Sequence, residues 1–352
     1  MQKKYLKYLI VILSPFAVPY SAIMNFRNFL FDRGILSEEK VNAKIISVGN
    51  LTVGGSGKTP TVVYVTKLLK RNNVKVGVLS RGYGRNSKGF KLVSDGEQLL
   101  LGVAKSGDEI VQVATECKVP AAVSEKRVLG AKKLIAETNV EAIVLDDAYQ
   151  HRWIARDLNI LIFDQRFLMK RDSIEQKTLP LGRMRESFGS IDRADIILIN
   201  RKFNKKRELS KKFVDLFENK IVHYGFYKSA GLIDVKSKQL YSLQEFDGQK
   251  SLVVCGIARP FSFLKVLEDN NIDIENRMLL KDHKVYSQKE VQQIRKTFYN
   301  TNSQSVITTE KDYVKLKEFT KELDDIDIYF LKIELQIENA DSFNNEILKI
   351  IT

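Results

Sequence analysis

The sequence contains little cysteine and little histidine, and this shortage excludes several classes of protein. Its 352 residues include two cysteines, Cys117 and Cys255, which lie far apart and outside any metal-ligand spacing. Two isolated cysteines argue against a disulfide framework and for a reducing compartment. The sequence also lacks an internal repeat, a low-complexity tract and a nucleic-acid-binding module. We therefore expect a globular protein that is not a disulfide-rich secreted domain and that has no recognisable nucleic-acid-binding module.

Acidic residues are fewer than basic ones, 43 against 57, which gives a formal net charge of +14. An excess of this kind indicates an anionic partner: nucleic acid, a membrane surface or a phosphorylated substrate. Part of the excess lies on helix-like faces that water can solvate, as at Lys205, Lys206, Lys211 and Lys212. The length predicts two domains, each large enough to bury a core.

One glycine-rich stretch has the context of a phosphate-binding loop. It follows an apolar run at 45–48 and precedes a segment with helical apolar spacing at 62–69. Glycines let backbone amides surround phosphate oxygens, and the start of the helix adds partial positive charge. Lys58 would reach the terminal phosphates, and Thr59 would ligate magnesium. The predicted nucleotide-binding residues are Thr52, Val53, Gly54, Gly55, Ser56, Gly57, Lys58 and Thr59.

The loop departs from the usual pattern at two positions. Thr52 occupies the place where the common spacing has a glycine, and Val53 the place where a related class of NTPases has a signature lysine. The alternative interpretation is a flexible loop that matches the pattern by chance. The flanking strand and helix, with Pro60 in the first helical turn where proline is tolerated, favour nucleotide binding.

Acidic residues lie at the end of one predicted element and at the start of another. Asp146 and Asp147 end an apolar strand at 140–145, where kinases and related enzymes hold magnesium; the alternative is a simple turn. Asp108 and Glu109 open a predicted helix at 108–117. Acidic residues in a first helical turn commonly complement the helix dipole. Beside a phosphate-binding loop they become candidates for a catalytic base or a metal ligand.

Arginines and one histidine on loops are weaker candidates. Arg81 and Arg85 follow the strand predicted at 74–79, and Arg185 lies in a loop at 179–186. Guanidinium groups pair with phosphate oxygens in a bidentate manner, so each could contact phosphate or substrate. His283 lies between two predicted elements, where it could transfer protons or be an ordinary surface residue.

The N-terminus is basic and then uncharged. Lysines occur at positions 3, 4 and 7, and no charged residue occurs at 8–26. Pro15 and Pro19 argue against a regular spanning helix, and no convincing cleavage site indicates a secretory signal. We favour a helix in the headgroup region of a membrane over one packed on the domain. The predicted division is a membrane-associating segment at 1–30, a phosphate-loop core at 31–225, a connecting ribbon at 226–248 and a second α/β domain at 249–352.

Together these segments resemble the tetraacyldisaccharide 4′-kinase (lipid A 4′-kinase) family over nearly the whole chain. The loop at 49–60 combined with Asp146-Asp147-Ala148-Tyr149-Gln150-His151 is the most specific part of the resemblance. Other matching segments are 28–34, 80–85, 107–109, 180–186, 256–260, 282–283 and 309–312. Ala148 and Lys284 are mild departures, since the family more often has glycine and histidine there.

The resemblance implies a fold: a P-loop NTPase-like three-layer α/β/α domain and a smaller α/β domain, joined by a hinge ribbon with the site between them. It also implies transfer of the γ-phosphate of ATP to the 4′-hydroxyl of tetraacyldisaccharide 1-phosphate, which gives lipid IVA. ATP and Mg²⁺ would be the cofactors. The enzyme would lie at the cytoplasmic face of the inner membrane, with no nucleic acid and no evident obligate protein partner.

The resemblance also assigns roles to residues. Asp108 would be the base, with His283 as its partner and Lys58 on the phosphates. Arg185 would bind phosphate or substrate. The implied metal ligands are Thr59, Glu109, Asp146, Asp147 and Gln150. Two other interpretations stay open: a nucleotide-switch ATPase whose output is conformation, and a kinase for a soluble sugar or nucleoside.

Overall fold

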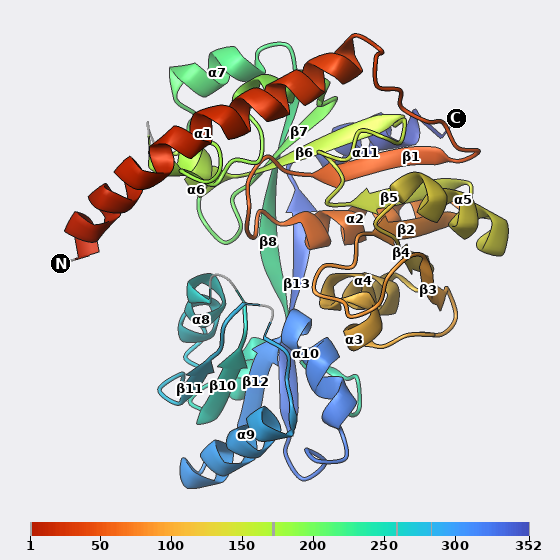
Figure 1. The fold of residues 1–352 in the computed structure, drawn as a ribbon. Helices are drawn as coiled ribbons and strands as arrows, with labels where there is room; N and C mark the ends of the chain where they lie inside the picture. Colours follow the sequence, from red (N-terminus) through yellow and green to blue (C-terminus); the bar gives the residue numbers. More distant parts are fainter. Residues whose placement is uncertain (1, 171–172, 258–259, 283, 352) are drawn as a thin grey trace.

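The computed structural model describes residues 2–170, 173–257, 260–282 and 284–351, and the side chains from position 15 onward. His283, one of the predicted catalytic residues, lies outside the described residues. Over the described ranges the chain forms two α/β lobes that share one thirteen-stranded sheet. The larger lobe carries the N-terminus, and the smaller one lies below it in Figure 1.

The larger lobe is built on a mainly parallel sheet in the order β7-β6-β1-β5-β2-β4-β3. Only the edge pair β3 and β4 is antiparallel. The central strands are buried on both faces and are correspondingly apolar. The bounds are β1 (Lys44–Gly49), β2 (Val76–Ser80), β3 (Lys91–Asp95), β4 (Pro120–Val123), β5 (Ala142–Asp146), β6 (Leu158–Asp164) and β7 (Ile196–Asn200).

Helices cover both faces of this sheet. One face packs against α2 (Lys58–Arg71) and α4 (Asp108–Cys117). The other packs against α5 (Arg127–Thr138) beside β5, and against α6 (Gln165–Leu168) and α7 (Lys211–Phe217) beside β6 and β7. The short α3 (Val103–Ser106) precedes α4, and 3₁₀ turns occur at Ile174–Gln176, Phe188–Arg193, Leu243–Phe246 and Lys317–Phe319. The predicted three-layer core is therefore present.

Two long antiparallel strands connect the lobes. β8 (Ile221–Asp234) continues the large sheet beside β7, and β13 (Ile328–Ile337) pairs with it from Ile337↔Gly225 to Tyr329↔Asp234. The register shifts between Lys332 and Ile333. The connecting ribbon expected at 226–248 thus has a second strand, β13, which comes from a distant part of the sequence. Figure 1 shows both strands running between the lobes.

The smaller lobe adds parallel strands to β13. Its strands are β10 (Ser251–Cys255), β11 (Arg277–Leu279) and β12 (Ser305–Thr309), and β9 (Leu240–Tyr241) pairs with β8. Its helices are α8 (Phe261–Glu268), α9 (Gln288–Asn300) and α10 (Glu310–Leu316). Ser287 and Glu290 form a capping box at the start of α9.

The last helix, α11 (Ala340–Leu348), packs on the larger lobe. Phe343 is fully buried, with its ring centroid 5.8 Å from that of Tyr64 on α2 and 5.2 Å from that of His223 on β8. The predicted second domain at 249–352 included these residues. The domain boundaries themselves remain predictions, but the core of the larger lobe includes a helix from the far end of the sequence.

The N-terminal segment forms one continuous helix. α1 (Gln2–Asp32) runs through Pro15 and Pro19, the prolines that argued against a regular membrane-spanning helix. A proline removes one helical hydrogen bond, and in an exposed helix water can satisfy the carbonyl that is released. Among the described residues, no helix is long and apolar enough to cross a membrane. The first half of α1 extends beyond the body of the lobe (Figure 1).

We expect Phe343→Ala to lower the free energy of unfolding by about 3–5 kcal/mol, because it opens a cavity in the larger lobe's core. Denaturant unfolding measures this change. The control is Phe261→Ala, since Phe261 is 61% exposed and its loss should change stability by under about 1 kcal/mol. Equal effects of the two substitutions would contradict the placement of α11.

Candidate active site

The phosphate-binding loop joins β1 to α2, as the sequence predicted. Gly57 precedes the helix with a φ of 104°, and Gly54 has a φ of 99°. Side chains are disfavoured at such positive φ angles. The loop is also held internally, because Asn50 Nδ2 donates to Ser56 Oγ at 2.8 Å. The backbone that the motif requires is therefore formed by these residues.

Asp147 is tied to the two cations nearest the loop. Both Arg185 guanidinium nitrogens Nη1 and Nη2 donate to its carboxylate oxygens, at 2.8 and 3.0 Å, and Lys58 Nζ lies 3.7 Å from Oδ1. Burial alone would raise the pKa of Asp147, but Lys58 and Arg185 outweigh burial and lower it. Asp147 is thus an ionised carboxylate beside the predicted phosphate position.

Asp146 lies in a different environment at the end of β5. It is 1% exposed. Its Oδ2 accepts a hydrogen bond from Ser80 Oγ at 3.3 Å, and its Oδ1 has no hydrogen-bond partner among the described residues. Burial, together with the charges of Glu109 and Asp147, raises its pKa to about 7, although Lys58 opposes the rise. A buried carboxylate oxygen with no partner is a place where a cation would be stabilised.

The acidic residues fit a magnesium ion that is shared with a nucleotide better than a complete protein cage. The described residues contain no group of three or more His, Cys, Asp or Glu side chains arranged to hold a metal. Magnesium commonly uses one or two carboxylates together with water and substrate phosphates. Thr59, Glu109 and Asp147 all line the same cavity, and Asp146 adjoins it.

Gln150, the other predicted ligand, is held by hydrogen bonds. Its Nε2 donates to the carbonyl oxygen of Asn50 at 2.9 Å, and its Oε1 accepts from Arg185 Nη1 at 3.2 Å. The carbonyl oxygen of Gln150 accepts from Arg27 Nη2 of α1 at 2.7 Å. Gln150 thus connects the phosphate loop, Arg185 and α1.

Asp108 lies at the start of α4 and is 5% exposed. Its Oδ1 accepts from the amide of Glu109 at 3.0 Å. Its Oδ2 faces two lysines of α10 in the smaller lobe, with Lys311 Nζ at 3.9 Å and Lys315 Nζ at 3.7 Å. The predicted base therefore lies where the two lobes meet.

The other predicted arginines lie farther from the loop. Arg85 pairs with Glu125 at 2.5 Å and donates to the carbonyl oxygen of Gly89 at 2.7 Å, so it braces its own loop. Arg81 is exposed. It lies near the buried Arg127, whose pKa is lowered to about 10 by burial and, to a smaller extent, by the charge of Arg81, against the opposing carboxylates. Of the three arginines, Arg185 is the one that lines the cavity.

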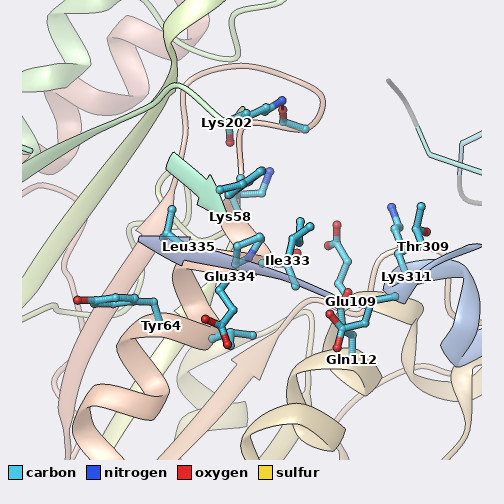
Figure 2. A pocket seen from close by; sticks show the side chains of 18 of the residues that line it. Lys58, Tyr64, Glu109, Gln112, Lys202, Thr309, Lys311, Ile333, Glu334 and Leu335 are labelled. Atoms are coloured by element: carbon cyan, nitrogen blue, oxygen red, sulfur yellow. Dashed lines mark hydrogen bonds between the residues drawn. The ribbon is translucent and has the colours of Figure 1, made fainter. Parts of the chain in front are cut away.

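A cavity of about 720 Å³ lies between the lobes. Figure 2 shows Lys58 toward one side of it, with Glu109 of the larger lobe close to Thr309 and Lys311 of the smaller lobe. Several of its lining residues were not predicted as site residues, and the most informative are Tyr64, Lys202, Lys311 and Ile333. The segment 309–312 was among those that resemble the family, but nothing in the sequence indicated that Lys311 reaches the larger lobe.

Comparison with known proteins identifies the family. The family model described as LpxK, tetraacyldisaccharide-1-P 4′-kinase, matches residues 9–352. The chain belongs to this family. The tetraacyldisaccharide 4′-kinase of Pelodictyon phaeoclathratiforme is 34% identical over 342 residues, covering 93% of each chain. That of Halothermothrix orenii is 32% identical over 353 residues, covering 95% of this chain and 91% of the relative.

A solved structure supports the same assignment. The crystal structure of LpxK from Aquifex aeolicus in complex with ATP superposes with a TM-score of 0.79 at 30% sequence identity. The match covers 98% of this chain and all of that chain. Membership of the tetraacyldisaccharide-1-P 4′-kinase family confirms the kinase assignment and the fold class predicted from the sequence, and ATP is the nucleotide bound in that relative.

We expect Asp146→Asn to stabilise the protein at high pH when magnesium and nucleotide are absent. A pKa raised from about 4 to about 7 makes the folded protein bind more protons than the unfolded chain within that window. The stability linked to Asp146 is therefore present below about pH 4 and lost as pH rises through about 7. The melting temperature of the variant relative to wild type should rise between about pH 4.5 and pH 7.5.

Asp95→Asn is the control, because backbone hydrogen bonds lower the pKa of that exposed carboxylate. A lowered pKa changes stability with pH in the opposite direction, so the melting temperature of Asp95→Asn relative to wild type should not rise with pH. A flat difference between wild type and Asp146→Asn would contradict the environment described for Asp146.

Proposed function

We propose that this chain transfers the γ-phosphate of ATP to the 4′-hydroxyl of tetraacyldisaccharide 1-phosphate, which gives lipid IVA in lipid A biosynthesis. The observation that carries the proposal is a cavity lined by Lys58, Asp147 and Lys311, with Asp108 beside Lys311. Lys58 and Asp147 adjoin the phosphate loop, while Asp108 meets Lys311 of the other lobe. Phosphoryl transfer needs charge balance and alignment more than covalent chemistry, and this cavity provides both.

The phosphate loop and its neighbours would hold the nucleotide. Lys58, which pairs with Asp147 here, would turn to the terminal phosphates. Thr59, Glu109, Asp146 and Asp147 would hold Mg²⁺, which neutralises phosphate charge when bound. At another part of the cavity Tyr64, Ile333 and Leu335 offer ring and aliphatic surface suited to the face of a purine (Figure 2).

Asp108 would act as the base that takes the hydroxyl proton. It is buried, and Lys311 and Lys315 balance its charge from the second lobe. Buried charge that is balanced in this way is tolerated only while the lobes are together. His283 is proposed as its partner on the sequence resemblance alone. Since the lysines come from α10, closure of the lobes would complete the site and restrain hydrolysis of ATP by water.

Arg185 and Gln150 would place the acceptor. Both contact Asp147 or the phosphate loop, and both also contact α1: Tyr20 Oη donates to the carbonyl oxygen of Arg185 at 3.0 Å. A substrate that approached along α1 would therefore reach the site directly. Arg81 remains a second candidate for contact with a phosphate of the substrate.

We further propose that α1 places the enzyme on the cytoplasmic surface of the inner membrane. Large apolar side chains on α1 are exposed, among them Phe16 and Phe26 at 62% each, Ile23 at 66% and Val18 at 72%. Lysines at positions 3, 4 and 7 would add attraction to anionic lipid. An amphipathic segment of this composition favours the interface over the aqueous phase.

We expect Asp108→Asn to lower phosphate transfer from γ-labelled ATP to tetraacyldisaccharide 1-phosphate in detergent micelles by about 10²- to 10⁴-fold. Binding of ATP should change little, because the variant keeps the phosphate loop intact. The control is Asp269→Asn, an exposed carboxylate paired with Lys265. A parallel loss of ATP affinity would move Asp108 from base to nucleotide or metal binding, and no lipid product from wild type would support the switch-ATPase interpretation.

We expect the double variant Phe16→Ser, Phe26→Ser to bind vesicles that contain anionic phospholipid about tenfold or more weakly than wild type. Each phenylalanine contributes roughly 1.5–3 kcal/mol when buried in an apolar phase. Flotation with the vesicles measures binding. Phe261→Ser, an equally exposed phenylalanine of the smaller lobe, is the matched control. Equal binding of all three proteins would contradict docking through α1 and favour a soluble acceptor.

A further inference from the structure

Three carbonyl oxygens of the phosphate-binding loop are each bonded by a side chain from outside the loop. The carbonyl oxygen of Val53 accepts from Arg183 Nη2 at 2.6 Å. That of Gly55 accepts from Lys202 Nζ at 2.9 Å, and that of Ser56 accepts from Asn200 Nδ2 at 3.2 Å. The donors come from two separate segments. Arg183 lies just before Arg185, while Asn200 ends β7 and Lys202 lies in the turn that follows.

Binding of these carbonyl oxygens fixes the direction of the amides that follow them. In a trans peptide the C=O and N–H of one peptide plane point in opposite directions. Anchoring the oxygens of Val53, Gly55 and Ser56 therefore turns the amides of the next residues, 54, 56 and 57, away from the three donors. Residues 53–57 all line the cavity, and amides directed there are the groups that bind phosphate oxygens.

The donors are themselves held in place. Lys202 also forms an ion pair with Asp164 at 3.0 Å. Its amide donates to Asn200 Oδ1 at 2.9 Å, and its carbonyl oxygen accepts from the amide of Tyr227 on β8 at 3.0 Å. Lys202 adopts a φ of 53°, which is uncommon for a residue with a side chain. The turn after β7 is thus fixed to β8 and presents Lys202 and Asn200 to the loop.

Two loop glycines make room for these donors. A Cβ atom at Gly54 would collide with Arg183 Nη2, and one at Gly57 would collide with Asn200 Nδ2 and with Tyr227 Oη. These two positions therefore need glycine both to leave room for the donors and to adopt positive φ angles. The contacts are part of how the loop is built rather than chance surface bonds.

We propose that Arg183, Lys202 and Asn200 are positioning residues that hold the phosphate loop in its binding conformation before nucleotide arrives. We call them the loop clamp. The proposal rests on the proposed function, because it concerns the same loop. Val53 stands where one class of phosphate loops has a second lysine. In this chain an additional cation, Lys202, bonds the loop's backbone and also lines the cavity beside it.

The test is ADP binding by calorimetry, with adenosine as the second ligand. Lys202→Met removes the ammonium and keeps most of the stem, and it should weaken ADP binding about tenfold, the effect of one charge-assisted hydrogen bond. Adenosine, which has no phosphate, should bind with unchanged affinity. In the transfer assay the KM for ATP should rise by a similar factor while kcat stays within about threefold of wild type, because bound nucleotide restores the loop.

Three further variants separate the clamp from a general structural role. Arg183→Met should weaken ADP binding in the same way through Val53. Lys202→Arg, which keeps the charge and a donor, should restore most of the affinity. Lys206→Met is the matched control, since Lys206 lies on the same segment but pairs with Glu338 at 2.7 Å, and it should bind ADP as wild type does.

The outcomes that overturn the proposal are distinct from failure of the proposed function. Wild-type affinity for ADP in Arg183→Met would overturn the clamp while leaving the kinase intact, whether or not Lys202→Met loses affinity, because Lys202 also lines the cavity and can contact phosphate directly. Equal losses for ADP and adenosine would also overturn it, because they indicate general damage. Absence of ADP binding in wild type would instead contradict the nucleotide site itself.

Discussion

The site depends on neutralising the negative charge of carboxylates that are shielded from water. Asp108 begins α4, Asp146 ends β5 and Asp147 lines the cavity between the lobes, and the first two are almost fully buried. Unpaired buried charge is costly, so each must meet a cation or stay protonated. Asp147 is paired with Lys58 and Arg185, and Asp108 with lysines of the other lobe. Among the described residues Asp146 forms no ion pair, and burial raises its pKa instead. The positions of the loop, the arginine segment and α10 follow from this requirement.

The same requirement links catalysis to the arrangement of the lobes. The cations for Asp108 are on α10, which β12 positions and which joins the larger lobe only across the cavity. A second set of charges, Lys332 of the ribbon with Glu116 and Glu310, lies beside it. Separation of the lobes would leave several buried charges without partners, so the closed arrangement is stabilised by the groups that form the site.

The local parts of the site could be predicted from the sequence. The loop with Lys58, the helix at Asp108 and the strand ending at Asp146 are each determined by a continuous segment with a clear pattern. The contacts of Lys202 and Lys311 could not be predicted, because they depend on how distant segments pair across the sheet. The prolines in α1 argued against a membrane-spanning helix, and none of the described helices is long and apolar enough to cross a membrane. The prolines did not show that α1 continues without a break, because water can satisfy the carbonyl that a proline releases on an exposed side.

The packing of α11 on the larger lobe limits the order in which the two lobes can fold. Phe343 and Ile347 belong to the same core as β1, β2 and α2. These residues are made more than 250 positions after that first strand and helix. During synthesis the smaller lobe is therefore complete before the larger one, although the larger lobe begins first. The wall of the cavity between the lobes includes Asn344, so this cavity is complete only after residue 344 has left the ribosome.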